Sequence, residues 1–291
     1  METIVIGIDG SEGAGHALKW AVAEALLHDA ELEAIYATGL PRAGNPLGSA
    51  PADLSAIDDS ARAIIDEAIS DHLRRHPDLR MRSRIEHGPA ASALVDAAAD
   101  ADLAVVGSRG IGGFKGLVLG SVSRHLSHHP PCPVAVLHPP REPSDQQHGR
   151  VTVGIDGSAA AAEAVRFAVE EAQTRRAALH VIHAWDVPDL ATLLPVFPDD
   201  PRPEQLEAGA LALLEQALGG IGEPDGVVVE PVVTRAHPAE ALIRGAAESD
   251  LLVVGARGDD SYGSVLLGSV SHACAEHSPC PVVIVPAGAT A

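Results

Sequence analysis

The stretch VVGSRGIGGFKGLVLGSVS, from Val105 to Ser123, returns later in the chain as VVGARGDDSYGSVLLGSVS, from Val253 to Ser271. In both copies a short apolar run is followed by the spacing Gly-x2-Gly-x9-Gly-Ser. The apolar run predicts a buried strand, and the glycines predict a tight turn before a helix that begins at the serine. A helix start offers unpaired amides and the positive end of a dipole, so the pattern is typical of a phosphate site.

The rest of the chain repeats together with this motif. The segment GIDGS at Gly7–Ser11 returns at Gly154–Ser158, an offset of 147 residues, whereas the glycine motif returns at an offset of 148. Two copies at so long a period indicate a tandem duplication, because a solenoid would show more copies at a shorter period. We expect one domain in residues 1–140, a Pro-rich polar linker at 141–150, and a second domain in residues 151–291.

Strand and helix patterns alternate within each domain. The expected strands lie at 3–8, 31–37, 80–86, 103–106 and 134–138, and then at 151–155, 178–185, 227–234, 251–254 and 282–285. Helices are expected between them, among them 54–75, 90–99, a helix ending near 218, and 238–248. Such alternation implies right-handed crossovers and, in each domain, a parallel sheet with helices on both faces, a Rossmann-like α/β fold. The loops 39–51 and 186–203 are interpreted as lids or as mobile surface.

The composition limits the classes of partner. Apolar residues make up 46% of the chain and aromatic residues only 2%, so the core is expected to consist of Ala, Val, Leu and Ile. A formal net charge of −20 disfavours nucleic acid and membrane surfaces as partners. Neither a signal peptide nor a spanning segment is recognised, so a soluble, cytoplasmic protein is expected. Cys132, Cys274 and Cys280 form no Cys-x-x-Cys pair and are interpreted as small buried side chains.

The ends of the first and fourth strands are the expected binding region. Ligands of doubly wound sheets bind at the carboxyl ends of strands, where the strand order reverses. If strand one lies beside strand four, Asp9 and Gly107 face each other across that crevice, and Asp156 and Gly255 do so in the second domain. A carboxylate there can accept hydrogen bonds from ribose hydroxyls.

The helix start at 120–123 is the expected phosphate site. It offers backbone amides and two serine hydroxyls, and Arg109 and Arg257 are either phosphate contacts or surface arginines. The segment is not a Walker A loop, because Lys115 is followed by Gly116 and has no counterpart in the second domain. The alternative is that the glycines only make a turn, which their duplication at identical spacing disfavours.

The segments GIDGS, VVGSRG, Gly-x2-Gly-x9-Gly-Ser-Val-Ser and the closing CPV together resemble the universal stress protein family, in its tandem-domain, ATP-binding form. The resemblance covers nearly all of both domains. It implies, in each domain, a five-stranded parallel sheet in the order 3-2-1-4-5 with ATP at its switch point. It also implies that the final strands VAVLH and VVIV pair, so that the two domains form an intrachain pseudo-dimer.

The resemblance also implies roles for single residues. In that family the aspartate after strand one approaches the ribose, the backbone at the end of strand two approaches adenine, and the glycine motif holds the ribose and phosphates. By position these are Asp9, Ala37, Gly107, Gly110, Gly120, Ser121 and Val122, and then Asp156, Ala184, Gly255, Gly258, Gly268, Ser269 and Val270. The remaining candidates for contact with the cofactor are Arg109, Ser123, Arg257 and Ser271.

The two sites differ at one point of the motif. Where the first domain has Ile111-Gly112, the second has Asp259-Asp260. These carboxylates would either repel a nucleotide or hold a divalent cation, Mg²⁺ or Mn²⁺, that bridges to it. We therefore expect the first domain to bind ATP more tightly.

The predicted function is that of an ATP-binding regulator of a stress or growth-arrest response. Rapid catalysis is not predicted, because no general base lies beside a nucleophile. One alternative is a slow metal-assisted ATPase or nucleotidyl-transfer enzyme, in which Asp9, Asp156 or the Asp259-Asp260 pair handles the metal. Another is an interaction module in which nucleotide is only a structural filler. A homodimer of whole chains is also expected as a partner state. The histidines at 125–129 are interpreted as a solvated helix end rather than as metal ligands.

Overall fold

The computed structural model describes residues 1–40, 54–111, 118–139, 147–186, 203–222, 224–258 and 267–288. Their contacts divide them into two compact units, which we call unit 1, up to residue 139, and unit 2, residues 147–288. Most of both predicted lids, Lys115 and the Asp259-Asp260 pair lie outside the described residues. In the described parts, no helix is both long and apolar enough to cross a membrane.

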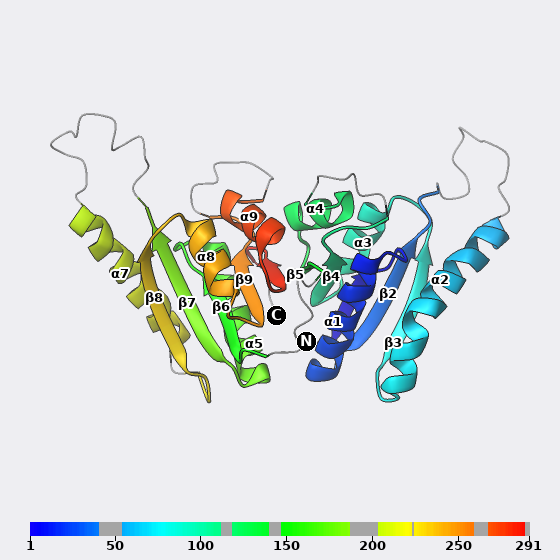
Figure 1. Cartoon of the computed structure of the whole chain (residues 1–291), viewed down its shortest axis with the longest axis horizontal. Helices are drawn as coiled ribbons and strands as arrows, with labels where there is room; N and C mark the ends of the chain where they lie inside the picture. Colours follow the sequence, from blue (N-terminus) through cyan, green and yellow to red (C-terminus); the bar gives the residue numbers. More distant parts are fainter. Residues whose placement is uncertain are drawn as a thin grey trace. The chain divides into compact units, whose positions relative to one another are not determined.

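Unit 1 is built of alternating strands and helices (Figure 1). Its strands are all parallel and pair in the order β3-β2-β1-β4-β5, as predicted. The elements are β1 (Thr3–Gly7), α1 (Glu12–His28), β2 (Glu31–Ala37), α2 (Leu54–Arg75), β3 (Met81–Glu86), α3 (Ala90–Ala98), β4 (Leu103–Gly107), α4 (Ser121–His128) and β5 (Val134–Leu137).

Unit 2 repeats this topology, with its strands parallel in the order β8-β7-β6-β9-β10. The prediction of two tandem Rossmann-like domains is thereby confirmed. The elements are β6 (Arg150–Gly154), α5 (Ala159–Arg175), β7 (Ala178–Trp185), α7 (Pro203–Ile221), β8 (Val229–Arg235), α8 (Pro238–Ala246), β9 (Leu251–Gly255), α9 (Ser269–His277) and β10 (Val282–Val285).

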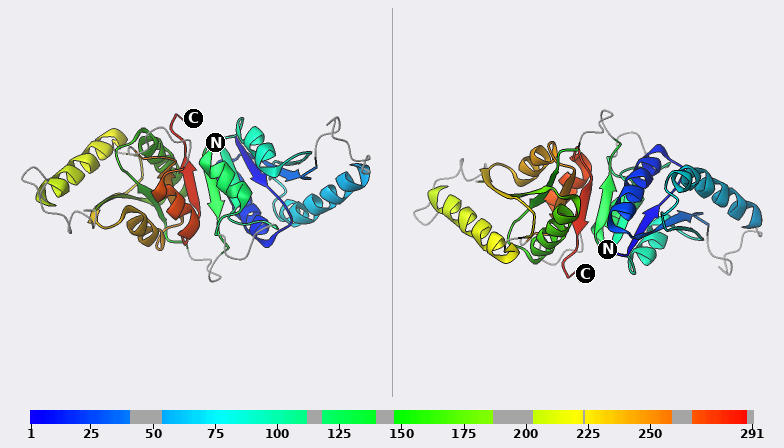
Figure 2. Two further views of the ribbon diagram at one scale, coloured as in Figure 1. Left: turned by 90° about the horizontal axis from the view of Figure 1, so that it is seen from above. Right: turned by 90° about the horizontal axis from the view of Figure 1, so that it is seen from below.

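Helices cover both faces of each sheet (Figure 2). In unit 1, α1 and α2 pack on one face and α3 and α4 on the other; in unit 2, α5 and α7 form one layer and α8 and α9 the other. The central strands are therefore buried on both sides, and Ile4, Leu32 and Val105 have no exposed surface. Because the chain leaves β1 and β4 toward opposite faces, a crevice opens at their carboxyl ends.

Three predicted boundaries were wrong by two or three residues, among them the end of α8, expected at residue 248 and found at Ala246. The helix expected to end near residue 218 continues to Ile221 and ends before Gly222, whose φ of 69° is the left-handed conformation typical of a helix C-terminus. The strand expected from residue 227 begins at Val229, since Gly226 still belongs to a turn, with φ 72°. The positions of glycines in the sequence could not place the end of α7, because Gly209, Gly219 and Gly220 lie inside this helix.

Candidate functional site

A cavity of about 500 Å³ lies at the carboxyl ends of β1 and β4 in unit 1. This volume is within the range of small-molecule pockets. Nine residues proposed from the sequence line it together: Asp9, Ala37, Gly107, Arg109, Gly110, Gly120, Ser121, Val122 and Ser123. They come from four separate strand ends and helix starts, which the switch point of the sheet brings to one place.

A smaller cavity of about 330 Å³ lies at the equivalent place in unit 2. It is lined by all nine second-domain candidates, Asp156, Ala184, Gly255, Arg257, Gly258, Gly268, Ser269, Val270 and Ser271. The duplication of sequence therefore corresponds to a duplication of the pocket.

Asp9 connects the turn after β1 to the glycine motif after β4. Its Oδ1 accepts a hydrogen bond from the amide of Ser11 at 2.9 Å, and its Oδ2 accepts one from the amide of Ile111 at 2.9 Å. In unit 2, Oδ1 of Asp156 likewise accepts from the amide of Ser158, at 3.0 Å. Each carboxylate oxygen has two lone pairs, so both aspartates retain capacity to accept from a ligand hydroxyl.

The motif glycines are required by close backbone approach. A Cβ on Gly107 would lie 2.7 Å from the carbonyl oxygen of Gly13, at the start of α1. A Cβ on Gly110 would collide with Oδ2 of Asp9, and one on Gly258 would collide with Oδ2 of Asp156. The glycines thus let the loop after β4 or β9 pack directly on the helix start and on the aspartate.

The helices that follow the motif begin without a side-chain cap. At the start of α1, Oγ of Ser11 accepts from the amide of Ala14 at 3.1 Å, as an N-cap does. By contrast α4 begins after Gly120 and α9 after Gly268, neither with a side-chain hydrogen bond to its first amides. These two helix starts line the pockets and so present amides and a positive dipole end to an anion.

The second serine of each Gly-Ser-Val-Ser differs from the prediction. The Ser123 hydroxyl donates to the carbonyl oxygens of Ser108, at 3.0 Å, and Gly120, at 3.2 Å, and the Ser271 hydroxyl donates to that of Gly255 at 2.6 Å. Because a hydroxyl has one proton, these side chains fasten the helix start to the strand end and do not offer that proton to a phosphate.

The apolar wall of the unit 1 pocket was not predicted. It is supplied by residues whose sequence context reads as core: Ile8, Ala14, Ile35, Tyr36, Ala90, Leu94, Val106 and Leu119. Ile8, Tyr36 and Val106 lie at or beside strand ends, whereas Ala14, Ala90 and Leu94 belong to helices, so no single local pattern marked this wall. In unit 2, Pro238 and Leu242 of α8 contribute to the corresponding wall.

The two pockets have different surroundings at the ends of their outer strands. In unit 1, His87 Nδ1 lies 3.3 Å from Oγ1 of Thr38, and its Nε2 lies 3.3 Å from Oδ1 of Asp58. In unit 2, the guanidinium carbon of Arg235 lies 5.6 Å from the ring centre of Trp185, a cation–π contact. His87, which precedes α3, therefore links α2 to the strand ends.

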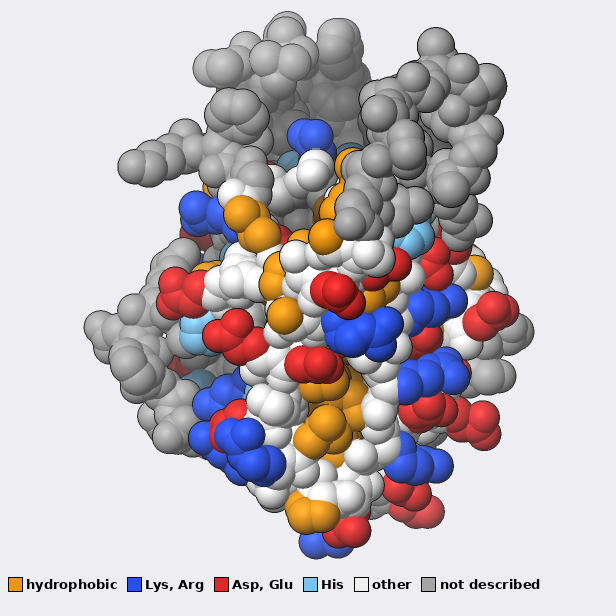
Figure 3. All heavy atoms as spheres, turned by 90° about the vertical axis from the view of Figure 1, so that its right-hand side faces the viewer, with side chains coloured by type: hydrophobic (Ala, Val, Ile, Leu, Met, Phe, Trp, Pro, Cys, Tyr) orange, Lys and Arg blue, Asp and Glu red, His pale blue; other side chains and the backbone are white. Residues whose placement is uncertain are grey.

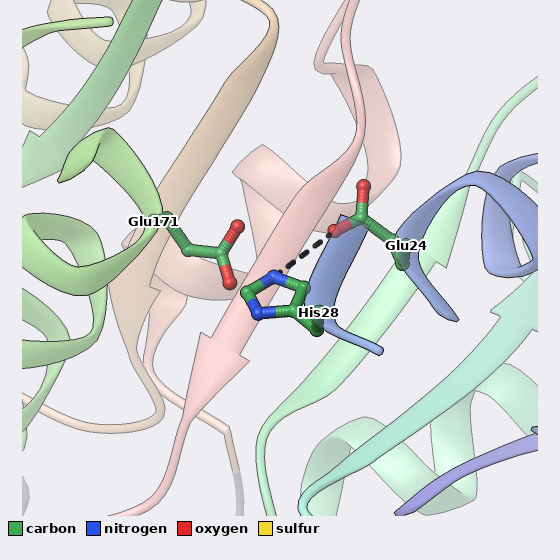
Figure 4. Close-up of side chains that lie close together, drawn as sticks. All are labelled: Glu24, His28 and Glu171. Atoms are coloured by element: carbon green, nitrogen blue, oxygen red, sulfur yellow. Dashed lines mark ion pairs between the residues drawn. The ribbon is translucent and has the colours of Figure 1, made fainter. Parts of the chain in front are cut away.

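Acidic and basic side chains are intermixed on the surface of unit 1 that Figure 3 shows, around a strip of apolar side chains. Ion pairs on this unit include Arg74 with Asp71, at 3.0 Å. Away from this surface, the buried side chain of Glu24 forms a pair with His28 on α1 at i, i+4 spacing, with Oε2 of Glu24 3.7 Å from Nε2 of His28 (Figure 4). Among the described residues that Figure 3 draws in colour, Lys and Arg are interspersed with Asp and Glu and form no extended basic patch of the kind that binds polyanions.

Known proteins resemble the chain over almost its full length. The family model described as universal stress protein family matches residues 1–138 and 148–286. A universal stress protein of Mycolicibacterium smegmatis is 34% identical over 289 residues, which cover 97% of this chain and 96% of that protein. One of Mycobacterium tuberculosis is 34% identical over 292 residues, covering 97% and 95%. The crystal structure of a universal stress protein from Archaeoglobus fulgidus matches 98% of both chains, with a TM-score of 0.70 and 20% identity, which supports the fold.

Proposed function

The chain belongs to the universal stress protein family, and from this premise we propose that each of its two units binds ATP, so that occupancy regulates a stress or growth-arrest response. The observation that carries the proposal is the pocket of unit 1. There the Asp9 carboxylate and the uncapped start of α4 line one cavity of small-molecule size. The aspartate suits ribose hydroxyls and the helix start suits phosphates.

The acidic character of the chain does not oppose this proposal. With 20 Lys and Arg against 40 Asp and Glu, the net charge is −20, yet the charge near the proposed phosphates comes from backbone amides and the α4 dipole. The exposed Arg109 also lines the pocket. The apolar wall with Tyr36 suits a planar base. We propose that Mg²⁺ or Mn²⁺ accompanies the nucleotide, held chiefly by its phosphates.

We propose binding without rapid turnover. Among the described residues of the unit 1 pocket, the one carboxylate, that of Asp9, already accepts two backbone hydrogen bonds. It therefore holds structure rather than activating a nucleophile. The alternative of a slow ATPase predicts several ADP per chain per minute, lost in Asp9→Ala. A binder without rapid turnover predicts one bound nucleotide per site and no sustained release of ADP.

The direct test uses native mass spectrometry and thermal unfolding of the purified chain with ATP and MgCl₂. A ligand that binds only the folded state stabilises it and so raises Tm. The stabilisation is about 2.7 kcal/mol when the ligand concentration is 100 times Kd. We expect Gly110→Ala to remove ATP from unit 1, because its Cβ collides with Asp9. Gly15→Ala is the matched control, since nothing lies within 4 Å of its Cβ. A chain that carries no nucleotide, and whose Tm ATP does not change, would overturn the proposal.

We propose further that unit 1 is the tighter site. Where the first copy of the motif has Ile111-Gly112, the second has Asp259-Asp260, whose carboxylates would repel the phosphates of ATP. Gly110→Ala should therefore weaken ATP binding in calorimetric titration more than Gly258→Ala. Equal losses, or a greater loss in Gly258→Ala, would contradict the order of affinities without affecting the proposal that both sites bind. The intrachain pseudo-dimer and the homodimer stay predictions.

A further inference from the structure

Strand β2 of unit 1 and the equivalent strand β7 of unit 2 carry an ionisable residue at the same position. In unit 1, Glu33 of β2 lies between Val5 of β1 and Arg82 of β3. In unit 2, His180 of β7 lies between Thr152 of β6 and Glu230 of β8. The charges are thus exchanged: an acid beside a base in one unit, and a base beside an acid in the other.

In unit 1 this position holds a salt-bridged carboxylate. Glu33 is only 7% exposed. Its Oε2 lies 3.3 Å from Nη2 of Arg82, and its Oε1 lies 3.1 Å from Nε of Arg84. Both oxygens therefore have a cationic partner, and the position has no imidazole to titrate.

In unit 2 the position belongs to a hydrogen-bond chain whose direction can be deduced. The Ser249 hydroxyl donates to the carbonyl oxygen of Gly245 at 2.9 Å, which uses its only proton. At the 2.7 Å contact between Oγ1 of Thr152 and Oγ of Ser249 either oxygen could donate, and with the serine proton on Gly245 we infer that threonine is the donor. Its oxygen can then only accept from Nδ1 of His180, 3.3 Å away. The chain assigns the ring proton of neutral His180 to Nδ1.

Three charged groups act on the ring. Arg150 of β6 lies between two carboxylates, with Nη2 3.1 Å from Oε2 of Glu230 and Nη1 3.3 Å from Oε2 of Glu248. Burial lowers the pKa of His180 from 6.5, and the charge of Arg150 lowers it further, whereas Glu230 and Glu248 act in the opposite direction. The first two causes prevail, so the environment favours the neutral ring.

Helix α8 rests directly on this ring. A Cβ on Gly245 would lie 2.6 Å from Cδ1 of Ile182 and 3.7 Å from the His180 ring, so the helix backbone packs on both side chains. At its other end α8 contributes Pro238 and Leu242 to the pocket of unit 2. The position of α8 therefore couples His180 to one wall of that pocket.

We propose that His180 makes the packing of α8 in unit 2 sensitive to acid, while the corresponding helix α3 of unit 1 is not. Protonation at Nε2 places a cation beneath α8, next to Arg150, in a site whose other hydrogen bonds Thr152 and Ser249 already fix. The helix loosens from β6 and β7, and the pocket wall formed by Pro238 and Leu242 becomes less ordered. This response of α8 to pH needs no ligand, so it is independent of the proposal that the chain binds ATP.

The direction of the pH effect follows from linkage. In the unfolded chain histidine titrates near 6.5, and in folded unit 2 the pKa of His180 is lower. Above both values the ring is neutral in both states and has no effect. As the pH falls below about 6.5, the unfolded state binds the proton first, so the free energy of unfolding decreases until the folded pKa is passed.

Hydrogen exchange of the full chain, measured by mass spectrometry at about pH 7.5 and about pH 5.5 and corrected for intrinsic rates, tests the proposal. We expect peptides from α8 to lose protection at the lower pH relative to peptides from α3. His180→Asn should remove this difference, because the asparagine amide can donate to Thr152 in place of Nδ1 but does not titrate. His277→Asn, at a surface ion pair of α9, is the matched control and should retain it.

Two outcomes would overturn the proposal: equal change in α8 and α3, or an unchanged response in His180→Asn. If the variant fails to fold, nitrogen NMR of the unaltered chain decides instead. We expect the ring nitrogens of His180 to report the Nδ1-protonated form at about pH 7.5. The Nε2-protonated form would contradict the deduced hydrogen-bond chain, on which the inference rests.

Discussion

Asp9 holds two separate backbone segments of unit 1 through one carboxylate. Its oxygens accept from the amides of Ser11 and Ile111. Asp9→Asn leaves one acceptor and turns an NH₂ group toward the other amide, so we expect a loss of about 1 kcal/mol in stability. The amide of Ser11 or Ile111 should exchange faster by NMR. Asp59→Asn, on the exposed surface of α2, is the control, and unchanged exchange at both amides would refute this role.

The three cysteines should be unreactive in the folded chain. Cys132 and Cys274 are buried as expected, whereas Cys280 is half-buried, and desolvation raises the pKa of each thiol to about 12. The thiolate is the reactive form, so it is scarce at neutral pH. We expect iodoacetamide at about pH 8 to label the native chain far more slowly than the chain in urea, as measured by mass spectrometry. Rapid labelling of native protein would instead point to a redox role.

At the scale of the element, the two N-cap serines are similar but not equivalent. Ser11 accepts from the amide of Ala14, whereas Ser158 accepts from the amide of Ala161 and also donates to the carbonyl oxygen of Arg257 at 3.2 Å. Replacing the cap by alanine typically costs about 1 kcal/mol. We expect Ser158→Ala to cost about 1 kcal/mol more than Ser11→Ala, because a second hydrogen bond is lost.

Hydrogen exchange of the first-turn amides of α1 and α5, measured in each variant, tests this difference in stability. Ser60→Ala serves as the control, because that exposed hydroxyl donates only to a carbonyl of its own helix. Equal losses of protection in the two serine variants would show that the contact with Arg257 contributes nothing to the start of α5.

Element types followed from local patterns, whereas some functions of single residues did not. The strand at 31–37 and the helix at 54–75 occur as predicted, because apolar periodicity and punctuation agree there. Ser123 is the contrasting case. Its hydroxyl was expected to face phosphate, but it donates to Ser108, 15 residues earlier. The local sequence Gly-Ser-Val-Ser does not reveal which backbone group accepts this hydrogen bond.

At the scale of the whole molecule, the net charge of −20 should make stability depend on salt. Excess like charge opposes the compact state, and the Debye length shortens from about 30 Å at 0.01 M salt to about 8 Å at 0.15 M. We expect Tm to rise over this range of NaCl. A fall in Tm would show that salt weakens surface ion pairs, such as that of Arg74 with Asp71 (3.0 Å), more than it screens the repulsion.

The sequence by itself determined the duplication, the α/β class and the nine candidate residues in each pocket, but not the apolar wall. It could do so because strand periodicity, glycine spacing and turn residues are local properties of the chain. The tertiary structure alone decided what the Val105–Ser123 motif contacts: Asp9 as the acceptor for Ile111, Gly13 against Gly107, and Ser108 as the partner of Ser123. It also decided that Glu33 and His180 occupy one position in two differently charged environments. Such contacts join residues distant along the chain, and only the parallel pairing of the strands brings them within hydrogen-bonding distance.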